Sequence, residues 1–257
     1  MKFCIIASGS EGNCTLIEDS QGCAVLVDAG LSMRRISAGL EELGKDFSGI
    51  CALLISHEHA DHLRGAAVLT RRLDLPIYAS PGTLSLVKRF FPPMTRMVAL
   101  NGQHLAFGNL RIEAFRVSHD ASEALGFIVT EGDRRLAIAT DLGNVDAATL
   151  EHLRSSNSII LEANHDLDML LAGPYPWDLK QRIRSSLGHL SNDQAAEALL
   201  QIAEPRLKRV ILAHLSQENN HPNLALTRVR DALRRAGHDH IEVIIADQYK
   251  PTCLYEL

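Results

Sequence analysis

The sequence is poor in features that would each point to a particular class of protein. It has five cysteines in 257 residues, and no two of them are spaced as Cys-x-x-Cys. An odd number without that spacing argues against a disulfide framework and against a cysteine-ligated zinc site. We therefore expect Cys4, Cys14, Cys23, Cys51 and Cys253 to be small, buried apolar side chains in a protein of the reducing cytoplasm.

Long apolar runs and an excess of basic charge are also absent. No stretch approaches the roughly 18 residues that a membrane-spanning helix needs, which excludes an integral membrane protein. The apolar stretch near the start, residues 3–7, has five residues, and it predicts a first strand, since a secretory signal needs about 7–15. The 26 basic and 31 acidic residues give a net charge of −5. This charge excludes a nucleic-acid binder that is basic over its whole surface but leaves a local basic groove possible.

The chain does have enough apolar residues, 46% of its length, to build a sizeable core. We find no internal repeat, no low-complexity tract and no Gly/Ser/Pro-rich linker. We therefore expect residues 1–257 to form a single domain.

Hydrophobic patterning predicts many short strands, with helices alternating with strands in the second half. The predicted strands cover residues 2–7, 14–18, 23–28, 51–55, 76–79, 95–99, 103–107, 110–117, 125–130, 134–139, 158–162, 208–213 and 241–245. The predicted helices cover residues 33–43, 63–73, 81–90, 146–155, 191–203 and 223–236. Each half-chain has several strands and covering helices, which predicts an α+β fold, a four-layer αββα sandwich of two mixed sheets flanked by helices.

The strongest chemical signal is the segment His57-Glu58-His59-Ala60-Asp61-His62, directly after a predicted strand. It holds three of the 12 histidines and two carboxylates within six residues. Alternate residues of an extended loop point the same way, so His57 and His59 can share one metal ion. Asp61 and His62, at the start of the next helix, can reach a second ion about 3.5–4 Å away, as in two-metal hydrolases.

This segment resembles the HxHxDH signature of the metallo-β-lactamase fold. The rest of that family's pattern follows in chain order, each residue just after an apolar strand-like run. The matching residues are Asp28, His119, Asp141 and His214.

A bacterial branch of this family, the YycJ/WalJ type, is similar at five further segments. These are Ser8–Cys14, Leu161–Asp166, Gly173–Pro176, Leu187–Asn192 and His214–Asn220. The resemblance implies exonuclease action on DNA.

The resemblance also implies two divalent metal ions per chain. The ligands would be His57, His59 and His119 for one ion and Asp61, His62 and His214 for the other, with Asp141 bridging them and Asp28 supporting the metal-binding loop. Asp61 would also act in catalysis. Histidine and carboxylate ligands without cysteine suit zinc, manganese or iron(II), so the ligand types leave the metal open.

His189 is a second candidate catalytic residue. It precedes Ser191, the predicted cap of a helix, and helix N-termini favour anions. A histidine there can hold the scissile phosphate or protonate the leaving oxygen. Gly188-His189-Leu190-Ser191 resembles an element of related nucleases, although a loop histidine without substrate contact is the alternative.

Other polar residues are weaker candidates for substrate contacts. Ser8, Ser10 and Asn13 lie in a glycine-rich turn whose N–H groups could meet a phosphate, with a plain β-hairpin as the alternative. Glu162, Asn164 and His165 follow a strand, where a supporting position is the alternative to a substrate contact. We expect the remaining histidines to lie at the surface: His104, His152, His221, His238 and His240.

These observations favour a two-metal phosphodiesterase, an exonuclease acting on nucleic acid with DNA preferred. The alternatives are a thioester or lactone hydrolase on the same site and a metal-bearing regulatory module without turnover. A flavin–di-iron protein is disfavoured, because that branch has a carboxylate at the position of His59. The adjacent Asp61-His62 pair argues against a metal-dependent amidohydrolase barrel. No protein partner is predicted.

Overall fold

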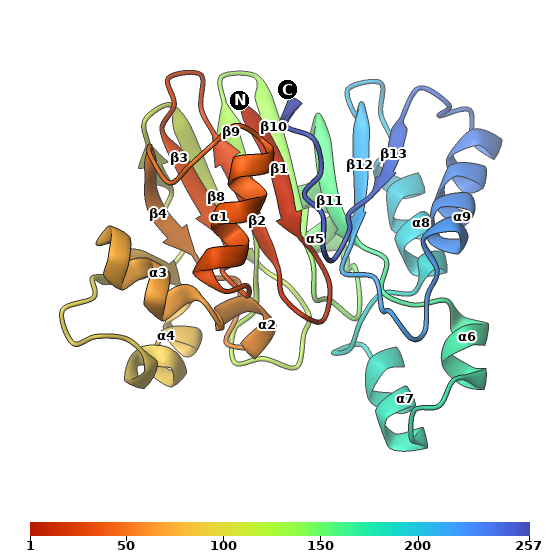
Figure 1. The fold of residues 1–257 in the computed structure, drawn as a ribbon. Helices are drawn as coiled ribbons and strands as arrows, with labels where there is room; N and C mark the ends of the chain where they lie inside the picture. Colours follow the sequence, from red (N-terminus) through yellow and green to blue (C-terminus); the bar gives the residue numbers. More distant parts are fainter.

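The computed structural model describes residues 1–257, and its strands form two seven-stranded sheets (Figure 1). The first sheet has the strand order β14-β1-β2-β3-β4-β5-β6. Its strands are β1 (Lys2–Ala7), β2 (Cys14–Glu18), β3 (Ala24–Val27), β4 (Ile50–Leu54), β5 (Ile77–Ala79), β6 (Met97–Ala99) and β14 (Tyr255–Glu256). The pairs from β14 to β3 are antiparallel and those from β3 to β6 are parallel, so this sheet is mixed.

The second sheet has the order β13-β12-β11-β10-β9-β8-β7 and is also mixed. Its strands are β7 (Leu105–Phe107), β8 (Leu110–Arg116), β9 (Leu125–Glu131), β10 (Arg134–Ala139), β11 (Ser158–Glu162), β12 (Arg209–Ala213) and β13 (Glu242–Ile245). Strands β7 to β10 pair antiparallel, and β10 to β13 pair parallel.

Helices cover the outer faces of both sheets, α1 and α3 on the first and α8 and α9 on the second (Figure 1). The helices are α1 (Met33–Glu42), α2 (Ala60–Leu63), α3 (Ala66–Leu73), α4 (Pro81–Val87), the 3₁₀ turn η1 (Lys88–Phe90), α5 (Ala147–Leu153), α6 (Leu167–Ala172), α7 (Trp177–Arg184), α8 (Asn192–Ile202) and α9 (Pro222–Arg235). The layers therefore confirm the predicted αββα sandwich. None of these helices is long and apolar enough to cross a membrane.

Alternation along the strands explains the layering. In β1, Phe3 and Ile5 enter the core between the sheets, whereas Cys4 and Ile6 face the helices. This split follows from the two-residue period of a strand. Both faces of the strand are covered, so β1 is apolar on nearly every residue.

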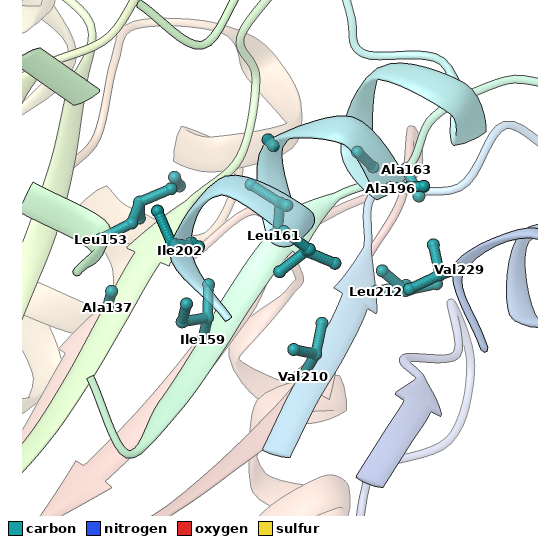
Figure 2. Packing of buried hydrophobic residues seen from close by; sticks show 14 of the residues in the cluster. Ala137, Leu153, Ile159, Leu161, Ala163, Ala196, Ile202, Val210, Leu212 and Val229 are labelled. Atoms are coloured by element: carbon teal, nitrogen blue, oxygen red, sulfur yellow. The ribbon is translucent and has the colours of Figure 1, made fainter. Parts of the chain in front are cut away.

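The outer face of the second sheet packs against α5, α8 and α9 in the same way. Figure 2 shows Ile159 and Leu161 of β11 beside Val210 and Leu212 of β12, below Ile202 of α8. These aliphatic side chains form the largest buried cluster of the molecule, of 24 residues.

We expect replacement of Ile159 by alanine to destabilise the protein by about 2–5 kcal/mol, because the side chain is 1% exposed and a cavity would remain. Chemical denaturation measures this loss. Leu200→Ala is the matched control, since Leu200 is 39% exposed on α8, and its cost is expected within about 0.5 kcal/mol. Equal effects of the two substitutions would contradict this account of the core.

Most predicted elements are confirmed, and the differences are local. The predicted helix 63–73 is two helices, α2 and α3, separated at Gly65. A side chain at Gly65 would lie 1.9 Å from the carbonyl oxygen of Leu31, so a close backbone approach interrupts the helix. Helices α6 and α7 and the short strand β14 were not predicted.

The cysteine prediction is correct for Cys4 and Cys14, which are buried, and wrong for the other three. Cys23 and Cys51 are half-buried and Cys253 is exposed. No disulfide links any of the five. That residues 1–257 form one domain stays a prediction.

Candidate metal centre

The polar residues singled out in the sequence lie at the ends of strands from both sheets. Asp28 follows β3 and the His57–His62 loop follows β4 of the first sheet, whereas His119, Asp141 and His214 follow β8, β10 and β12 of the second. The sandwich therefore brings segments more than 150 residues apart in the chain to one edge.

Three residues with a strained backbone lie at this same edge of the sandwich. Asp28, Asp141 and His214 have φ angles of 61°, 56° and 55°, in the left-handed region that non-glycine residues rarely adopt. Each follows the end of a buried strand, and the turn directs its side chain toward the others. Strain of this kind is typical of functional sites, where the surrounding structure compensates for its cost.

The first group of side chains comprises His57, His59 and His119. Nε2 of His119 lies 3.4 Å from Nδ1 of His59. Nε2 of His57 is buried and has no hydrogen-bond partner. Three ring nitrogens thus converge within 4.8 Å of one another, an arrangement that suits a divalent metal ion.

The second group comprises Asp61, His62, Asp141 and His214. Nε2 of His62 lies 3.5 Å from Oδ2 of Asp61 and 3.3 Å from Oδ2 of Asp141. Nε2 of His214 lies 3.4 Å from the same oxygen of Asp61. The structure therefore brings all seven predicted ligands together in two adjoining groups.

In the second group, carboxylates contact the histidine ring nitrogen, Nδ1, that does not face Asp61. Oδ2 of Asp28 lies 2.8 Å from Nδ1 of His62 and accepts a hydrogen bond from the Ser56 hydroxyl. Oδ1 of Asp28 accepts the backbone N–H of Ser56. A carboxylate on the outer nitrogen fixes the ring so that its other nitrogen faces the other candidate ligands.

Glu162 supports His214 and His189 together. Its Oε1 lies 2.9 Å from Nδ1 of His214 and 2.8 Å from Nδ1 of His189. Its Oε2 accepts the backbone N–H groups of Leu142 and Leu190. Glu162 is fully buried, so it positions the two histidines and has no surface left for a substrate.

The charges of the site are strongly coupled. Burial by itself would lower the pKa of His62 and His214, but Asp141, together with Asp28 for His62, raises the pKa of each well above its ordinary value. Burial opposes ionisation of Asp141 and Asp61 too, yet His214 and His62 lower the pKa of both carboxyl groups. Protons on histidines thus balance the acidic charge, and divalent ions would take the place of these protons.

His57 and His119 behave differently. Burial and the neighbouring His62 hold the pKa of His57 well below its usual value, and burial also lowers the pKa of His119. Neutral imidazoles are the metal-binding form. Nε2 of His57 and Oδ2 of Asp141 also lack a hydrogen bond of good geometry, so the residues present fit a divalent-metal site.

The structure leaves few N–H groups of the Ser8–Asn13 turn free for the predicted contact with a substrate. The N–H groups of Ser8, Gly9 and Asn13 already donate within the protein, and so do those of Glu11 and Gly12. Asn13 is buried with Nδ2 3.4 Å from Oδ2 of Asp61, and the Ser8 hydroxyl accepts the N–H of His214. Only exposed Ser10 has an N–H without a hydrogen-bond partner in the protein.

Asn164 and His165 are buried behind the site. Asn164 donates to the carbonyl oxygen of His214. Burial lowers the pKa of His165 to about 4, and its Nδ1 has no partner. Among the histidines expected at the surface, His104, His221 and His240 are exposed, whereas His152 and His238 are half-buried.

Sequence reasoning missed the contribution of Ser56. Its hydroxyl connects Asp28 with Nδ1 of His57 and of His62, at 3.0 and 3.1 Å from the two rings. The only signal was its place directly before the histidine segment. Gly30 was also missed, and a side chain there would lie 1.6 Å from the carbonyl oxygen of Asp61, so only glycine lets this loop reach its position.

Comparisons with known proteins agree with this geometry. A family model described as a Beta-lactamase superfamily domain matches residues 24–215. Exodeoxyribonuclease YycJ of Bacillus anthracis is 34% identical, over 98% of this chain and 97% of that protein. Exodeoxyribonuclease WalJ of Streptococcus pneumoniae is 37% identical, over 91% of this chain and 89% of that protein.

A solved structure shows the same fold. The metallo-beta-lactamase fold protein YhfI from Bacillus subtilis superimposes with a TM-score of 0.74 and 17% identity, over 98% of each chain. The identity is low, so this likeness concerns the fold alone.

Proposed function

The chain belongs to the β-lactamase superfamily, and from that membership we propose that it is a metal-dependent exonuclease that hydrolyses phosphodiester bonds of DNA. The curated relatives named as exodeoxyribonucleases align with most of the chain. The observation that carries the proposal is the place of His189. It lies outside both groups of predicted ligands, in an adjoining cluster with Asp141, Glu162 and His214, and its Nδ1 lies 3.9 Å from Oδ1 of Asp141.

We propose that two ions bind, one to each group, with Asp141 shared between them. Asp141 supports this arrangement because it contacts His62 and also acts on the pKa of His57 and His119 in the other group. Zinc, manganese and iron(II) all suit these donors. When bound, such ions supply Lewis acidity toward a phosphodiester and its attacking water.

In this proposal His189 serves the leaving oxygen. Glu162 accepts a hydrogen bond from Nδ1 of His189, which places that proton on Nδ1 and leaves Nε2 for the substrate. Burial opposes a charge on His189, but Glu162 raises the pKa of the ring above its ordinary value. A protonated His189 can then donate from Nε2 to the oxygen that leaves.

Asp61 would serve the water on the other side of the phosphate. Its carboxylate is 21% exposed, whereas the side chains of His62, Asp141 and His214 are almost fully buried. It is thus the member of the second group that a water or substrate can reach. Ser8 and Asn13 lie beneath the ligands, and we propose that they position them.

The test is to remove metal with a chelator and restore zinc, manganese or iron(II) separately. We expect no hydrolysis without metal, and release of nucleotides from the ends of labelled single- and double-stranded DNA, faster than from RNA, after reconstitution. A thioester and a lactone serve as competing substrates. Hydrolysis of either without cleavage of any phosphodiester would reject the nuclease and support the alternative hydrolase.

A cytoplasmic location belongs to the same proposal, because five free cysteines suit a reducing compartment. The proposed partner is the DNA substrate.

A further inference from the structure

A cavity of about 210 Å³ adjoins the candidate metal centre on the side of α7. His189 and His214 form one part of its wall, and Tyr175, Leu179 and Ile183 form another. Figure 1 shows that α6 and α7 stand apart from the two layers of helices that cover the sheets. These helices therefore do little for the main core, and they wall a space beside His189.

The α7 side of the cavity suits a flat, uncharged ring. Leu179, Arg182 and Ile183 lie on one face of the helix, at the spacing of neighbours on a helix surface. Tyr175 adds an aromatic ring just before the helix, and its hydroxyl has no hydrogen-bond partner within the protein. Arg182 is ion-paired with Asp120, so it offers no free positive charge to a second phosphate.

The rest of the lining is polar. It includes Ser10, Asn164 and Ser216 together with the two histidines. Polar groups that share a cavity with an aromatic ring match a nucleobase, which has polar edges and apolar faces.

The turn that carries Tyr175 is held in place by a buried lysine. Nζ of Lys180, on α7, donates to the carbonyl oxygens of Leu171 and Gly173 at 2.7 and 2.6 Å. These contacts join the end of α6 to α7 across the turn. The segment after α7 is attached to the metal-binding side, because the N–H of Asp120 donates to the carbonyl oxygen of Leu187. The wall is thus preformed, which reduces the entropy lost on binding.

We infer that this cavity binds the base of the nucleotide attached to the scissile phosphate, with Tyr175 as the stacking residue. The inference rests on the proposed function. Ligand pockets for drug-sized molecules measure about 300–1,000 Å³, so a cavity of about 210 Å³ suits a group of the size of one base.

The experiment compares Tyr175→Ala and Tyr175→Phe with Trp177→Ala as the matched control. Trp177 is an exposed aromatic residue two positions away that does not line the cavity. For Tyr175→Ala we expect KM for a single-stranded oligodeoxynucleotide to rise about 5- to 150-fold, the range of base stacking on an aromatic side chain. Tyr175→Phe keeps the ring and is expected within about threefold of the wild type. Hydrolysis of the same oligodeoxynucleotide with an abasic terminal residue, which has no ring to stack, should be unchanged.

Titration of the protein with a deoxynucleoside monophosphate and with deoxyribose 5-phosphate gives a readout that does not depend on turnover. We expect the base to improve the affinity of the wild type and of Trp177→Ala, and to add nothing in Tyr175→Ala. Equal affinities for the two phosphates in the wild type would overturn the inference. An equal loss of both hydrolytic activities in Tyr175→Ala would also overturn it and assign Tyr175 to the folding of the α6–α7 turn.

A failure of the proposed function would give a different result from a failure of this inference. In that case the wild type cleaves no DNA with any metal, and the monophosphate titration still decides whether the cavity binds a base.

Discussion

Replacing Asp61 by alanine is expected to lower kcat/KM for phosphodiester hydrolysis by about 10³-fold while the fold is retained. Oδ2 of Asp61 faces Nε2 of His62 and of His214, so its removal takes away the accessible carboxylate of the second group. Stabilisation by a metal ion contributes several kcal/mol to a transition state, and each 1.36 kcal/mol is a factor of ten in rate. Steady-state kinetics with metal analysis of the same sample measures both effects.

Metal analysis separates the two groups of ligands. We expect the variant to lose one ion and to keep the ion at His57, His59 and His119, which Asp61 does not touch. Asp168→Ala is the control, since Asp168 is an exposed carboxylate on α6 outside every ligand group. Near-normal turnover with two ions bound would show that Asp61 has been assigned wrongly.

Replacing His189 by alanine is expected to lower kcat by about 10²–10⁴-fold, the range of a well-placed general acid. Metal content should be unchanged, because His189 lies outside both predicted ligand sets. The loss should be larger for DNA than for an ester with an activated leaving group, since the activated group needs less protonation as it departs. Rates on both substrates and metal analysis test the three statements.

Two results would contradict this assignment of His189. A fall in metal content that parallels the loss of activity would make it a ligand, as its proximity to Asp141, Glu162 and His214 allows. Unchanged rates on every phosphodiester would make it a structural histidine of its loop. His104→Ala is the matched control, because His104 is exposed and belongs to none of the ligand groups.

The sequence predicts those elements of the fold whose burial produces a local pattern of apolar residues. Strands such as β1 and β11 are covered on both faces, and their apolar runs identify them without any knowledge of their neighbours. Helices α6 and α7 are short, flank a Gly173–Pro176 turn and cover little of the core, so they lack a long amphipathic pattern. Strand β14 has two residues, which is too short for any pattern.

Four of the seven candidate metal ligands were likewise local information. His57, His59, Asp61 and His62 lie within six residues, and their spacing follows from the geometry of a loop that enters a helix. The distant candidates were recognised through the resemblance to the metallo-β-lactamase fold, and their positions after strands agree with it, because strand ends gather at sheet edges. The sequence by itself therefore determined the fold class, the seven ligand candidates and the class of chemistry.

Only the tertiary structure decided which residues position the histidines of the site and which line the adjoining cavity. Whether Glu162 contacts a substrate or positions a histidine depends on its burial and on two rings that are 27 and 52 residues away. The same holds for Ser56 between Asp28 and His62, and for the cavity wall at Tyr175. Hydrogen bonds and cavities depend on positions in space to within an ångström. Residue type and spacing along the chain do not contain that information when the partners come from different sheets.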